Sequence, residues 1–92
     1  MRIRPNTWDN EIVQSVLVDN EYGLPDDMHG MTVLDIGAHI GSFAVACQKR
    51  NAKQVICYEP DPENVQVLAF NVEEDVESKT HITVYENAVT GN

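Results

Sequence analysis

The chain of 92 residues is long enough for one domain and carries 15 acidic against 6 basic side chains, a formal net charge of −9. This charge repels phosphate backbones and anionic lipid headgroups, which disfavours nucleic acids and membranes as partners. No apolar run approaches the ~20 residues of a membrane span and no secretory leader is evident, so we expect a cytoplasmic protein.

Residues 1–30 are expected to form a helical segment that precedes the main fold. Thr7 supplies a hydroxyl N-cap, and acidic residues follow it in the first turn. The apolar side chains that then recur at helical spacing are Trp8, Ile12, Val13, Val16 and Leu17. Gly23 and Pro25 are stop signals that end this helix.

Residues 31–92 alternate strands with helices. Short apolar runs rich in β-branched residues predict three strands, at 32–36, 54–58 and 81–85. Apolar residues at spacings of three and four predict two helices between them, at 42–50 and from Glu63 onward. Such strands joined by helices imply parallel βαβ units with right-handed crossovers. We therefore expect a single α/β domain over 1–92, with a Rossmann-like three-layer fold and a parallel sheet.

The two cysteines and two of the histidines are not predicted to have a catalytic or metal-binding role. Cys47 and Cys57 lie within apolar patterns, which favours reduced thiols in the core over a disulfide or a zinc site. His29 and His81 are isolated and are expected to face solvent, so no metal site is predicted.

The junction between the first of these strands and the helix after it carries the residues that suggest a ligand site. Gly37 permits a tight turn, and Gly41 removes a Cβ where a ligand or the strand approaches the helix start. Asp35 can accept hydrogen bonds from loop amides or from the ammonium group of a ligand. Glu59 ends the next strand, where a carboxylate can hold both hydroxyls of a ribose.

The spacing differs from the dinucleotide-binding fingerprint. Gly-x-Gly-x-x-Gly requires a second glycine at position 39, and the chain has His39 there. Since a pyrophosphate needs close access to the backbone at that point, NAD and FAD are disfavoured. A ligand with a ribose and no phosphate fits better, and S-adenosylmethionine is such a ligand.

The sequence resembles the class I S-adenosylmethionine-dependent methyltransferases, and among them most of all the FkbM family. The resemblance rests on Asp-x-Gly-Ala-x-x-Gly-x-Phe from Asp35 to Phe43, followed by Tyr58-Glu59-Pro60-Asp61-Pro62. Further agreement comes from Asn64, Leu68 and Asn71, from Asn87-Ala88-Val89, and from the stretch between Thr7 and Pro25. His39 departs from the pattern, because the family typically has Asn at this position.

This resemblance implies S-adenosylmethionine as the cofactor and a set of residues around it. Those that would line its methionine and ribose part are Asp35, Gly37, Ala38, His39 and Gly41. Glu59 would hold the ribose hydroxyls, and the residues beside the adenine would be Pro60, Asp61, Asn87 and Ala88. No residue matches an acceptor-side base.

Two functions stay open at this point. The resemblance implies methyl transfer, to an oxygen of a small or sugar-like acceptor, with the chain as the cofactor-binding half of the enzyme. The alternative is a non-catalytic binding or assembly module derived from a methyltransferase. Taken singly, Asp35 and Gly41 are compatible with a structural role in any α/β protein, whereas their combination with Glu59 favours a binding site.

A complete class I methyltransferase sheet has more strands than the chain supplies, and one of the missing strands would lie beside residues 32–36. The chain is therefore expected to be a truncated methyltransferase, or to complete its sheet with a second copy. A bare apolar strand edge is an association hazard. We expect a homodimer or higher assembly through this edge, and a monomeric mass by light scattering would contradict that expectation.

Overall fold

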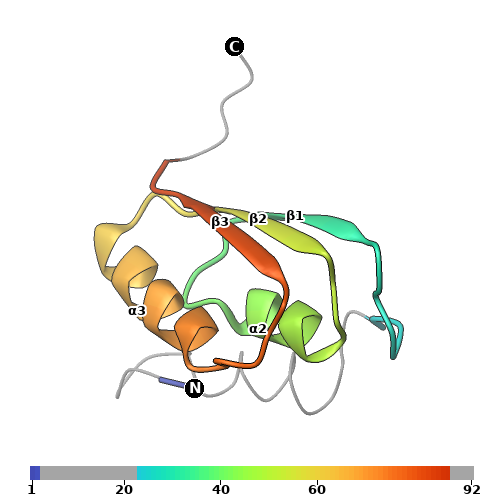
Figure 1. The fold of residues 1–92 in the computed structure, drawn as a ribbon. Helices are drawn as coiled ribbons and strands as arrows, with labels where there is room; N and C mark the ends of the chain where they lie inside the picture. Colours follow the sequence, from blue (N-terminus) through green and yellow to red (C-terminus); the bar gives the residue numbers. More distant parts are fainter. Residues whose placement is uncertain (3–22, 88–92) are drawn as a thin grey trace.

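The computed structural model describes residues 1–2 and 23–87, so the helix expected within 7–22 and the predicted site residue Ala88 lie outside the described residues. The described elements are β1 (Thr32–Ile36), α2 (Ser42–Lys49), β2 (Gln54–Tyr58), α3 (Pro62–Glu73) and β3 (His81–Tyr85) (Figure 1). This alternation confirms the predicted α/β layout.

All three strands have their predicted bounds, and each helix differs from its prediction at one end. α2 ends at Lys49, one residue early, because the backbone turns at Asn51, which has a φ of 65°. Asparagine tolerates this left-handed conformation and often terminates helices. α3 begins at Pro62 because the Asp61 side chain accepts the Glu63 amide at 2.9 Å. Proline suits the first helical position, where its missing N–H costs nothing.

The sheet is wholly parallel and has the order β1-β2-β3. Ile36, Tyr58 and Tyr85 stand in one row at the carboxyl ends of the strands. The chain segments that leave these ends therefore meet at the same edge of the sheet, which is where the predicted ligand site lies.

The core lies between the sheet and the two helices, which cover the same face of it (Figure 1). Val55 and Cys57 of β2 are fully buried there, against Cys47 of α2 and Leu68 of α3. Both cysteines are free. Burial raises the pKa of Cys47 to about 11 and that of Cys57 to about 12, so both stay protonated near neutral pH. Their predicted role as reduced core thiols is confirmed.

The opposite face of the sheet is open within the described part of the chain, so two of the three expected layers are visible. β1 is an edge strand, and its Leu34 and Ile36 side chains are 58% and 60% exposed. The apolar edge anticipated from the sequence is therefore present, while self-association through it stays a prediction. Across residues 1–2 and 23–87, no helix combines the length and the apolar character that a membrane span requires.

Candidate functional site

Residues 37–41, here called the glycine loop, connect β1 to α2 and are tied to β2. The amides of Gly37 and Ala38 donate to the Tyr58 carbonyl oxygen at 2.9 and 3.1 Å. Three residues of the loop have positive φ: 74° at Gly37, 52° at His39 and 91° at Gly41. Glycine adopts this region freely, whereas a histidine does so at some cost. His39 is exposed, so its side chain lies at the surface of the loop.

Glu59, which follows β2, holds the glycine loop and the start of α3 together. Its side chain is only 4% exposed. Oε1 accepts the His39 amide at 2.7 Å, while Oε2 accepts the Asp61 amide at 3.0 Å and the Asn64 Nδ2 at 3.3 Å. A carboxylate has about four acceptor positions, so roughly one remains for a ligand. Binding both hydroxyls of a ribose would require one of these three donors to be displaced.

Asp35 lies near the end of β1 with an unpartnered oxygen. Its Oδ2 is buried and has no hydrogen-bond partner among the residues that the structure describes. The loop amides, which the sequence suggested as donors, bind the Tyr58 carbonyl and Glu59 instead. Burial raises the pKa of Asp35 to about 6; His39 opposes this shift and the Glu59 carboxylate adds to it. A buried acceptor without a donor is suited to a cationic N–H group of a ligand.

The raised pKa of Asp35 predicts a pH-dependent cost to stability. Its carboxyl group is half-protonated at about pH 6 when folded and at the ordinary 3.8 when unfolded. Between these values the folded state binds more protons, so the free energy of unfolding falls as the pH rises and stays lowered above the folded pKa. Asp35→Asn lacks this charge. We expect the variant to melt at a higher temperature than the parent at about pH 7.5, and the difference to shrink toward pH 5. Thermal unfolding across this range checks it; a difference that does not vary with pH would contradict the shift.

Gly41 is a position of close approach, and within the described residues the group that approaches it is a side chain of α3. A Cβ built on Gly41 would lie 3.1 Å from Cγ of Leu68, on α3. The glycine therefore allows α3 to pack directly against the start of α2. Its missing side chain serves the packing of the two helices.

The remaining predicted site residues lie around this centre. Ala38 is buried within the glycine loop, and Pro60 and Asp61 are exposed immediately after Glu59. Asp61 has a structural role as the N-cap of α3. Asn87 is exposed two residues after β3. The binding roles of all these residues stay predictions.

Three side chains near the site were not assigned to it from the sequence. Asn64 is buried and donates to Glu59. Tyr58 and Tyr85 stack at the carboxyl ends of β2 and β3, with ring centroids 5.0 Å apart. The signal for Asn64 was available in its position one turn before Leu68, on the buried face of the helix. The stacking of the two tyrosines depends on the register between β2 and β3, which cannot be predicted from the sequence of either strand alone.

A cavity of about 1120 Å³ lies away from this site, at the opposite end of the sheet. Its lining includes Asp27, Lys53 and Lys79, from the loops that precede the strands. None of the predicted ligand-binding residues lines it. In parallel α/β sheets, ligands bind at the carboxyl ends of the strands, so the glycine loop remains the candidate site.

The sequence matches no protein-family model and no curated protein. It is similar to solved structures. PH1948 of Pyrococcus horikoshii, a candidate RNA methyltransferase, is 30% identical with a TM-score of 0.54, over 86% of this chain and 38% of that chain. YcgJ of Bacillus subtilis is 19% identical with a TM-score of 0.54, over 82% of this chain and 30% of that chain. The bifunctional kinase-methyltransferase WbdD is 21% identical with a TM-score of 0.50, over 88% of this chain and 17% of that chain.

These likenesses establish a Rossmann-like fold of the kind found in methyltransferases. The chain spans 38% of the length of PH1948 and a smaller share of the other two.

Proposed function

We propose that the chain is the cofactor-binding half of an S-adenosylmethionine-dependent methyltransferase of the FkbM type. The observation that carries the proposal is that two acids, the half-buried Asp35 and the buried Glu59, lie beside the glycine loop. Asp35 offers an unpartnered buried oxygen at the end of β1, and Glu59 offers a carboxylate that is 4% exposed after β2. The methyltransferase fold supports the same function.

The residues present fit this cofactor in charge and in hydrogen-bonding capacity. S-adenosylmethionine carries an ammonium and a sulfonium group and has no phosphate. Two carboxylates near each other attract a cation and repel a phosphate. The unpartnered Oδ2 of Asp35 would accept the ammonium group, and the free acceptor position on Glu59 would accept a ribose hydroxyl.

In this function the described residues position the cofactor and leave proton transfer to other groups. When bound, S-adenosylmethionine supplies an activated methyl group, and transfer requires an acceptor atom in line with it. Holding two reactants in such a geometry accounts for much of the rate gain in reactions of this kind. The glycine loop is suited to this task because Tyr58 and Glu59 fix its backbone. Within residues 1–2 and 23–87 we assign no acceptor-side base.

The acceptor in this proposal is small or sugar-like, with methylation at an oxygen. The RNA named for PH1948 is a poor candidate, since a net charge of −9 repels a polyanion. This charge equally disfavours membranes. The protein partner is a second copy of the chain, which would cover the exposed Leu34 and Ile36 of β1.

A second candidate function is a binding or assembly module that keeps the site without turnover. The exposed apolar edge at β1 favours it, because such an edge can pair with another chain. The two candidates share the cofactor site and differ in whether methyl groups are transferred.

Calorimetric titration with S-adenosylhomocysteine tests the proposal. We expect saturable binding with one site per chain and a dissociation constant on the order of micromolar, corresponding to about −8 kcal/mol. NAD⁺ serves as the control, because its pyrophosphate would meet Asp35 and Glu59. An absence of binding to S-adenosylhomocysteine, or equal binding of NAD⁺, would overturn the assignment of the cofactor.

A further inference from the structure

One face of α3 packs against the glycine loop and against Glu59, which binds that loop. Asn64, Leu68 and Asn71 occupy this face at spacings of four and three, and all three are buried. Asn64 acts through Glu59, which holds the His39 amide, and Leu68 packs against Gly41. Asn71 binds the loop directly.

The Asn71 side chain holds the carbonyl group that precedes Gly41. Its Nδ2 donates to the Ile40 carbonyl oxygen at 2.7 Å, and the side chain is 3% exposed. Ile40 is fully buried and lies between His39 and Gly41, which both have positive φ. A hydrogen bond that holds the Ile40 carbonyl therefore restrains the backbone of the loop on both sides of it. A buried hydrogen bond of this kind is costly to break, since the carbonyl would remain without a partner.

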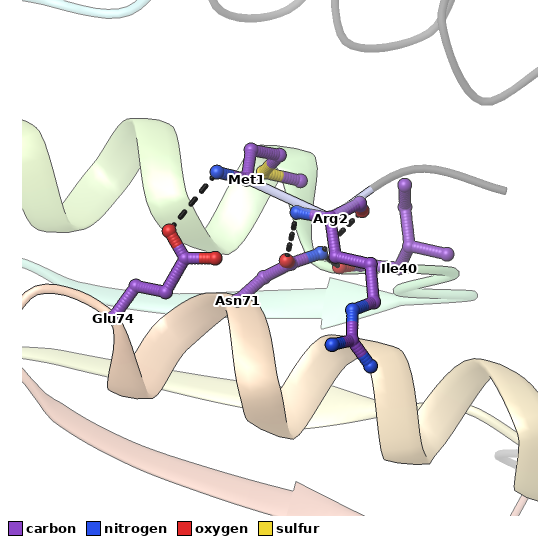
Figure 2. A network of polar contacts seen from close by, with 5 residues as sticks. All are labelled: Met1, Arg2, Ile40, Asn71 and Glu74. Atoms are coloured by element: carbon purple, nitrogen blue, oxygen red, sulfur yellow. Dashed lines mark hydrogen bonds and ion pairs between the residues drawn. The ribbon is translucent and has the colours of Figure 1, made fainter.

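The same amide group is fixed from the other side by the first residues of the chain (Figure 2). Nδ2 also donates to the Arg2 carbonyl oxygen at 3.0 Å, and Oδ1 accepts the Arg2 amide. The Arg2 guanidinium lies 4.1 Å from the centre of the Phe70 ring, and the Met1 amino group pairs with Glu74 at 3.0 Å. Both hydrogens of the amide group are therefore used, which leaves it one orientation.

We propose that Asn71 is a positioning residue for the cofactor, because it sets the conformation of the glycine loop from a buried position on α3. This inference rests on the proposed function for its effect on affinity, but its effect on the loop does not depend on it. Asn64 acts in the same sense and more weakly. Its bond to Glu59 is longer, at 3.3 Å, and Glu59 keeps two backbone donors without it.

The test compares Asn71→Ala with Val72→Ala, its neighbour on α3. Val72 is 8% exposed and packs in the core, and the structure gives it no bond to the glycine loop. Both variants lose stability, so both are studied well below their melting temperatures. We expect Asn71→Ala to bind S-adenosylhomocysteine about 10-fold more weakly and Val72→Ala to stay within about 2-fold, since a lost buried hydrogen bond corresponds to roughly that factor. Asn64→Ala should fall between them.

Amide hydrogen exchange of the ligand-free proteins provides the second readout. Asn71→Ala should speed exchange at the amides of His39 and Gly41 by about 10-fold relative to the core strands, whereas Val72→Ala should change all amides together. A parent protein that fails to bind S-adenosylhomocysteine while the loop still loosens in Asn71→Ala would refute the proposed cofactor and keep the role of Asn71 in the loop. Unchanged exchange in Asn71→Ala, or equal loosening in Val72→Ala, would overturn the inference itself.

Discussion

Replacing Glu59 by glutamine is expected to weaken the binding of S-adenosylhomocysteine by about 100-fold, because charged hydrogen bonds of roughly 1.5–3 kcal/mol are involved. Three donors converge on this carboxylate, from His39, Asp61 and Asn64. A glutamine has one acceptor oxygen and one amino group. In either orientation the amide NH₂ group of the glutamine would face an N–H donor. The hydrogen bond to the glycine loop, or those to the start of α3, would therefore be lost. The acceptor position left for a ribose hydroxyl would be lost as well.

The matched control is Glu77→Gln, which makes the same change of charge in the exposed segment between α3 and β3. It should leave affinity within about 2-fold, since screened surface charges contribute little. Calorimetry gives the affinities, and thermal unfolding shows whether Glu59→Gln remains folded at the temperature of the titration. A Glu59→Gln protein that stays folded and binds as tightly as the parent would refute the role of Glu59 in the site.

The sequence was sufficient to predict the strands and the edge of the sheet that carries the site. Each strand is a short apolar run that is followed by a residue which ends strands, such as Gly37 after β1 and Pro60 after β2. Once the strands are parallel and adjacent, Asp35 and Glu59 must emerge at the same edge. Their proximity therefore follows from topology, and the structure adds the electrostatic coupling between them.

The partners of these side chains could not be predicted in the same way. Glu59 serves three donors because Asn64 faces it from α3, while the unpartnered Oδ2 of Asp35 results from the loop amides turning to Tyr58. Both facts depend on the rotation of α3 about its axis and on the positive φ angles of the loop. Local patterns in the sequence specify neither. The approach of Leu68 to Gly41 was not predicted for the same reason.

Replacing Gly41 by alanine is expected to lower the free energy of unfolding by about 2–3 kcal/mol, of which roughly 1–2 kcal/mol is the cost of a left-handed backbone for an L-residue. The rest is steric. The new Cβ would lie 3.1 Å from Cγ of Leu68, whose side chain is fully buried and cannot move away freely. Each kilocalorie lowers the melting temperature of a small domain by roughly 4–8 °C, so the shift should be on the order of 10–20 °C.

Gly30→Ala isolates the steric part of this effect. Gly30 has a φ of 80°, close to the 91° of Gly41, but a Cβ there meets nothing within 4 Å in the described structure. This control should cost only the conformational term of about 1–2 kcal/mol. Urea titrations of both variants give the difference between them, which measures how tightly α3 packs on the start of α2. An equal loss of unfolding free energy in the two variants would mean that the Leu68 side chain moves aside without an energetic cost. In that case α3 would not restrain the glycine loop as firmly as its contacts indicate.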